Sequence, residues 1–238
     1  MTHPSQTTEQ KSPWWLALRV IDEPGAVFRA LAQKPTVILP IILLVLTAGI
    51  VAVGTPASTL RSRAERQADI VEQRAPERMT ADDRAEMLEE AAGTRNRAII
   101  FGAGSVVGFI ALLGVAGVLL LIFNAAGTQP LKFKDELAIA THAYVPQLLG
   151  AILMIVLARF ASFEESLSLG FLVREGFLHN LGQQITLFGA WNVVLLALGN
   201  QIRAGMKGLG TPLFIVGGLW MLVNVGFAGI ASAFGGAG

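Results

Sequence analysis

One uncharged run dominates the sequence, and it reads Ala98-Ile-Ile-Phe-Gly-Ala-Gly-Ser-Val-Val-Gly-Phe-Ile-Ala-Leu-Leu-Gly-Val-Ala-Gly-Val-Leu-Leu-Leu-Ile-Phe123. As a helix that rises about 1.5 Å per residue, it would measure about 39 Å, more than the ~30 Å hydrocarbon core of a bilayer. The run therefore predicts a membrane-spanning helix that is long enough to tilt.

Four further apolar runs are spaced along the chain, at residues 36–54, 137–160, 183–202 and 213–234. Within the run at 183–202, the stretch Ile185–Gly199 covers only about 22 Å, so polar residues beside it must lie near the interfaces or against other helices. Its Asn192 and Gly199 share one helical sector, which indicates a face packed on protein. The chain is therefore predicted to be an all-α polytopic membrane protein with five transmembrane helices.

Composition agrees with this class, because only 15% of the residues are charged while 53% are hydrophobic. An ordinary soluble domain carries about 25% charged residues. Residues 1–12 are polar and predicted to be disordered, and 13–238 are predicted to form a single membrane domain. Paired Trp14 and Trp15 beside Arg19 predict an N-terminal interfacial helix, and the alternative is a helix packed on the end of the bundle.

Residues 55–97 form the one large extramembrane segment, with eight Arg and nine acidic residues. Thr80-Ala-Asp-Asp83 predicts the N-terminal cap of a helix that Gly93 would end, so the segment is expected to be a helical hairpin. Its acids alternate with arginines at helical spacing, which favours a solvated charged face over a cation site.

Positive charge in the short loops predicts the orientation. If the N-terminus is in the cytoplasm and the long loop is left out of the count, the cytoplasmic side holds eight Lys and Arg residues and the other side two. The eight are Lys11, Arg19, Arg29, Lys34, Lys132, Lys134, Arg203 and Lys207, and the two are Arg159 and Arg174. With the long loop included the count becomes eight against ten, so the prediction of a cytoplasmic N-terminus rests on the short loops. The membrane expected is the inner, cytoplasmic one.

Catalytic patterns are not found in this sequence. It has no cysteine, its three histidines lie on separate segments, and no phosphate loop or nucleophile elbow occurs. No Asp or Glu falls inside the five predicted spans, which argues against proton relays and intramembrane aspartyl chemistry. The sequence therefore predicts a protein that is not an enzyme, with no cofactor, no metal and no nucleic-acid partner.

The candidate positions are neutral polar groups and small residues within the predicted spans: His142, Tyr144, Pro146, Gln147, Asn192, Asn224, Gly104 and Gly108. Their polar side chains either line a cavity for a substrate or lipid headgroup, or they only make interhelical hydrogen bonds. Pro146 predicts a kink. Gly104 and Gly108 form a small-xxx-small pair, for which packing inside the chain is favoured over homodimerisation.

Three segments resemble the Yip (Ypt-interacting-protein) domain family, in its bacterial members. Phe188 and Trp191, followed by an apolar run to Gly199, are similar to the family's fourth span. Ala143-Tyr144-Val145-Pro146 is similar to the entry of its third span, and Glu23–Pro35 to its N-terminal segment. The resemblance implies a five-span bundle with a cytosolic N-terminus, and it transfers no catalytic residue. Eukaryotic relatives bind Rab GTPases, a role that bacterial members lack the machinery to share.

The leading hypothesis is a non-enzymatic membrane scaffold or adaptor that acts through helix–helix or protein–protein contacts. Its expected partners are the lipid bilayer and other membrane proteins or a second copy of the chain. The alternative is a small transporter or lipid-handling protein that uses polar groups of the third and fourth spans.

Overall fold

The computed structural model describes residues 13–74, 80–127, 129–160, 168–173 and 176–235. In these ranges the chain is helical, apart from turns and one isolated β-bridge between Ser168 and Thr186. The helices are α1 Pro13–Arg19, α2 Pro24–Gln33, α3 Ile38–Gly54, α4 Ala57–Arg74, α5 Ala81–Ala91, α6 Thr94–Ala126, α7 Phe133–Ala143, α8 Val145–Phe160, the 3-10 turn η2 Leu169–Leu172, α9 Gly176–Gln184, α10 Leu187–Arg203 and α11 Gly210–Gly235. The predicted disordered segment 1–12 lies outside the described residues.

Three helical segments are long and apolar enough to cross a membrane: α6, the pair α7–α8 over Phe133–Leu157, and α11 over Gly210–Ile230. A fourth is counted if α3 and α4, which meet at 85°, are taken as one bent span. Large apolar side chains on these helices stay exposed, including Phe214 at 82% and Leu121 at 73%. Exposed apolar faces of this extent are those of helices that meet lipid.

Helix α10 lies at the centre of the bundle, in contact with α2, α7, α8 and α11. Gly199 sets how closely it packs, because a Cβ there would lie 2.5 Å from Ile139 Cγ2 and 3.0 Å from Phe28 Cε1. Both neighbours are buried, and Phe28 comes from α2, whose apolar face is Val27, Phe28 and Leu31. The N-terminal segment thus packs on the bundle, while Leu18 beside it remains 63% exposed.

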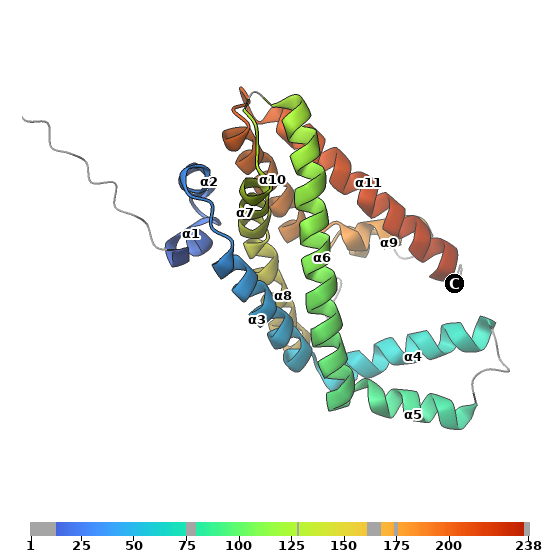
Figure 1. The fold of residues 1–238 in the computed structure, drawn as a ribbon. Coiled ribbons are helices and arrows are strands. Elements are labelled where there is room, and N and C mark those ends of the chain that lie inside the picture. The colour runs from blue at the N-terminus through green and yellow to red at the C-terminus, as the bar shows by residue number, and fades with distance from the viewer. Residues whose placement is uncertain (1–12, 75–79, 128, 161–167, 174–175, 236–238) are drawn as a thin grey trace, which may run out of the picture.

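The helices α4 and α5 project from one end of the bundle as a hairpin (Figure 1). The predicted cap is present: Thr80 Oγ1 accepts a bond from the Asp83 N–H, and the Asp83 carboxylate accepts one from the Thr80 N–H. Bonds from the Thr80 hydroxyl and N–H hold the pKa of Asp83 below its ordinary value. Arg84 joins the two helices by ion pairs to Asp69, at 2.6 Å, and Glu72, at 2.7 Å.

Arg97 fixes the corner from which the hairpin leaves the bundle. Its Nη1 donates to three carbonyls at the end of α3, those of Ala52, Val53 and Thr55, at 2.8, 2.9 and 3.0 Å. These carbonyls lack helical partners because α3 ends there. One arginine of α6 therefore caps α3 and joins two segments that are 45 residues apart.

Candidate functional site: a polar seam and two cavities

A seam of buried polar groups joins α7 to α10. At its outer end, Arg203 Nη2 donates to Asp135 Oδ2 at 2.8 Å, and the same oxygen accepts the Lys132 N–H at 3.0 Å. The carboxylate thus caps the start of α7 and pairs with the last residue of α10. Because Asp135 is only 7% exposed, this ion pair is geometrically constrained rather than a freely solvated surface pair.

Glu136 and Asn200 form the next pair of the seam, with Glu136 on α7 and Asn200 on α10, and both are fully buried. Asn200 Nδ2 donates to Glu136 Oε1 at 2.9 Å and to the Leu196 carbonyl at 3.0 Å. Glu136 Oε2 and Asn200 Oδ1 have no hydrogen-bond partner among the described residues. Buried polar atoms without a partner are costly, and the bond between the two side chains satisfies only one oxygen of Glu136.

His142 lies one helical turn and a half further along α7, and it is also fully buried. Its Nδ1 lies 2.9 Å from the Ala138 carbonyl, and since a carbonyl only accepts, Nδ1 carries the hydrogen. Its Nε2 has no partner in the described part of the chain. His142 therefore bonds within its own helix, and it lines neither of the two cavities described below.

The helix breaks at Tyr144, between α7 and α8, as Pro146 predicts. Proline has no N–H, and the Gln147 N–H bonds to the Tyr144 carbonyl rather than to that of Ala143. Asn192 Nδ2 donates to the freed Ala143 carbonyl at 2.8 Å, across from α10. A side chain of a neighbouring helix thus satisfies the backbone at the break, which a helix in lipid requires.

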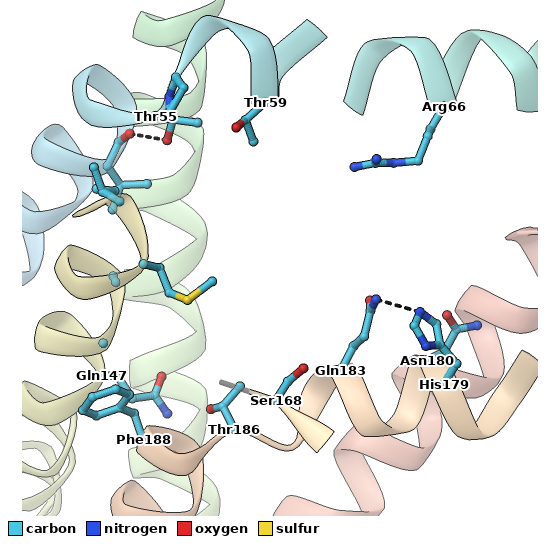
Figure 2. Close-up of a pocket in the computed structure, with 16 residues that line it drawn as sticks. Thr55, Thr59, Arg66, Gln147, Ser168, His179, Asn180, Gln183, Thr186 and Phe188 are labelled. Carbon is cyan, nitrogen blue, oxygen red and sulfur yellow. Dashed lines mark hydrogen bonds between the residues drawn. The ribbon is translucent and has the colours of Figure 1, made fainter. Parts of the chain in front are cut away.

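The first cavity, of about 860 Å³, lies between α4, α8 and α9, at the hairpin end of the bundle. Figure 2 shows polar side chains around it, with Arg66 reaching in from α4. Across from it, His179 Nδ1 contacts the Val173 carbonyl at 2.6 Å, and its Nε2 lies 2.8 Å from Gln183 Nε2. Because Nδ1 donates to the carbonyl, Nε2 accepts from Gln183, and the amide is held in one orientation (Figure 2).

The second cavity, of about 610 Å³, is a mainly apolar groove between α6 and α11, with α10 at its floor. Gln147, Gln183 and Thr186 line both cavities, so the two meet at these residues. Val115 and Phe227 on the rim of the groove are 39% and 60% exposed, so the groove opens on the outer surface of the bundle.

The structure brings together five of the eight candidate positions, since the second cavity is lined by Gly108, Tyr144, Gln147, Asn192 and Asn224. Asn224 Nδ2 donates to the Trp220 carbonyl of its own helix at 2.7 Å. Packing at the glycine pair differs from the prediction: a Cβ at Gly104 or Gly108 would meet nothing within 4 Å. The close helix packing lies instead at Gly199 and at Gly150, where a Cβ would be 2.5 Å from the Phe188 ring.

Sequence reasoning missed the buried acids, because it began the third span at residue 137. The helix begins at Phe133, so Asp135 and Glu136 fall inside the segment that is long and apolar enough to span. The statement that the spans hold no acidic residue is therefore wrong for this segment. The signal was present, since an acidic residue at the third position of a helix can accept the N–H of the residue before the helix, as Asp135 accepts that of Lys132.

The groups of the seam make hydrogen bonds and one ion pair, Arg203–Asp135. In the described residues, no group of three or more His, Asp or Glu side chains is placed to hold a metal ion. The seam joins two helices and the cavities are lined mostly by neutral groups. The arrangement is suited to holding helices and binding amphiphilic molecules.

A bundle of apolar helices with lipid-facing exposed surfaces, joined by buried polar pairs, defines a helical transmembrane protein. The model of the Yip1 domain family matches residues 18–236, and the chain therefore belongs to that family. Neither a curated protein nor a solved structure matches it.

Proposed function

We propose that this protein is a non-enzymatic membrane scaffold or adaptor that binds other proteins through its projecting hairpin. The observation that carries the proposal is the hairpin itself. Two helices that Arg84 ties together extend beyond the bundle and expose charged faces, with Glu86, Glu89 and Glu90 along α5 all exposed. A fixed, charged arm outside the bundle offers a surface for electrostatic recognition by a protein partner.

The proposed topology has five spans in a single membrane domain, residues 13–238, of the inner membrane. The helices α3 and α10 have 17 residues each and would measure about 25 Å, so they need short flanking segments at the interfaces to complete a crossing. α2 buries its apolar face against α10, while Leu18 of α1 is 63% exposed, so we place α2 on the end of the bundle and α1 at the membrane interface. The N-terminus is then cytoplasmic and the hairpin lies on the other side.

A second surface supports contacts within the membrane. Along α6, a Cβ at Gly104 or at Gly108, which lie four residues apart on one side of the helix, would enter open space. A face of small residues lets another helix approach closely. The described part of the chain supplies no such helix there, so other membrane proteins or a second copy are the expected partners.

Site-specific photocrosslinking in intact membranes tests this function. A photoreactive residue at Glu89 should form adducts with a protein partner, and one at Phe214, which is 82% exposed on α11, should form them only with lipid. Gln147→Leu should leave the Glu89 adducts unchanged, because Gln147 lines the cavities and not the hairpin. Loss of the adducts in a stably inserted Gln147→Leu protein, or no protein adduct at Glu89, would refute the scaffold function.

A further inference from the structure

The two cavities differ in polarity and meet at one junction. The chamber beside α4 has a mixed lining of hydroxyl, amide, imidazole and guanidinium groups and of apolar side chains such as Met154 and Ile155, whereas the groove between α6 and α11 is mostly apolar. Gln147, Gln183 and Thr186 belong to both. A site with a polar end and an apolar end, each between about 300 and 1,000 Å³ as ligand pockets usually are, fits an amphiphile.

The charge of the chamber indicates which headgroup it takes. Among the residues that the structure describes, Arg66 is the one charged side chain that lines either cavity. Arg66 is exposed and forms no ion pair with a described residue, and it points into the chamber (Figure 2). A guanidinium that forms no ion pair with a described residue can bind a phosphate, which accepts two parallel N–H bonds from it.

The groove indicates where the ligand comes from. Its rim residues Val115 and Phe227 are exposed on helices that face lipid, so a chain can enter sideways from the bilayer. A helix of a second copy could cover the groove, but it would leave Arg66 without an anion. A molecule that carries both an acyl chain and an anionic head matches the whole site.

We propose that the two cavities bind one anionic phospholipid of the bilayer, with its phosphate at Arg66 and an acyl chain between α6 and α11. Gln183, held by His179, presents its amide at the junction, where the glycerol ester region would lie. The bound lipid would fill the space between α4, α9 and the bundle. This site goes beyond the scaffold function and does not depend on it.

Native mass spectrometry of the detergent-purified protein, titrated with phosphatidylglycerol or phosphatidylcholine, tests the proposal. The full chain should bind one phosphatidylglycerol more tightly than phosphatidylcholine. Arg66→Ala should lose roughly tenfold in affinity for phosphatidylglycerol, as expected for removing a charge-assisted contact with phosphate. Arg61→Ala is the matched control, because Arg61 is also exposed on α4 but lines neither cavity, and it should bind like the unaltered chain.

Gly108→Phe tests the position of the acyl chain. A Cβ at Gly108 meets nothing within 4 Å and the residue lines the groove, so the ring should fill the groove without distorting the bundle. Binding of both lipids should weaken. Equal losses in Arg66→Ala and Arg61→Ala, unchanged binding in Gly108→Phe, or dimers free of lipid would each overturn the proposal.

Discussion

Replacing Gly199 by Ala adds one methyl group at the closest contact of α10. The new Cβ would lie 2.5 Å from Ile139 Cγ2 and 3.0 Å from Phe28 Cε1, and both side chains are buried, at 3% and 2% exposure. Neither neighbour can move into solvent, so α10 must shift away from α2 and α7. We therefore expect the substitution to destabilise the fold.

The magnitude follows from two opposing effects. Overpacking a closely packed core costs about 1–3 kcal/mol. Alanine in place of glycine in a helix returns up to about 1 kcal/mol. Gly104→Ala gains only the second effect, because nothing lies within 4 Å of its Cβ. The two variants should thus differ by about 2 kcal/mol, which for a chain of this size corresponds to roughly 4–8 °C in Tm.

The assay heats each detergent-solubilised variant and measures the fraction that remains monodisperse by size-exclusion chromatography. Gly199→Ala should lose half its monodisperse fraction at a lower temperature than Gly104→Ala, which is the control. The midpoint of the unaltered chain should lie between those of the two variants or close to that of Gly104→Ala. Equal midpoints for the two alanine variants, or a higher one for Gly199→Ala, would refute the close packing of α10 on α2 and α7.

Three further predictions concern the end of α3, the break between α7 and α8, and the hairpin. Arg97→Ala should destabilise the protein by about 2–3 kcal/mol, because three carbonyls at the end of α3 lose their shared donor. Arg97→Lys should recover only part of the lost stability. An unchanged Tm in Arg97→Ala would contradict this role. Asn192→Leu should lower the stability of the fold by about 0.6–2 kcal/mol, because the Ala143 carbonyl loses its donor, while insertion into the membrane stays unchanged. Asn224→Leu breaks only a bond within α11, so it should lower the stability less. In the hairpin, hydrogen bonds with Thr80 hold the pKa of Asp83 low. The stabilisation that Asp83 gives to the start of α5 is therefore present at pH values above the ordinary carboxyl range, and it is lost as the pH falls through the lowered pKa. Spin labels on α4 and α5 should show a distance distribution that broadens on acidification. The broadening should begin at a higher pH in Thr80→Val than in the unaltered chain. If both proteins broaden at the same pH, the cap is not the cause.

Much of the architecture could be predicted from periodicity and charge. α6 and α11 are apolar runs too long and too free of charge to be anything but membrane helices, and the Thr80 cap was readable from a four-residue pattern. The break at Pro146 follows from the missing N–H of proline. These features depend on local chemistry, which sequence carries directly.

Features that depend on contacts between distant helices could not be predicted in the same way. Gly104 and Gly199 are both glycines in apolar helices, and nothing local indicates that only Gly199 meets a neighbouring helix. The buried Asp135 and Glu136 look like loop acids until Arg203 and Asn200 are brought beside them from α10. Arg66 likewise looks like one of many hairpin charges, and only the fold turns it toward α9.

Five spans require the hairpin and the loop between α10 and α11 to lie on opposite sides of the membrane. The sequence has no cysteine, so single cysteines at Ser62 and Lys207, both exposed, can be labelled without background. A membrane-impermeant maleimide should label Ser62→Cys from outside the cell, and Lys207→Cys only after the membrane is opened. Labelling of both positions from the same side would contradict the five-span topology.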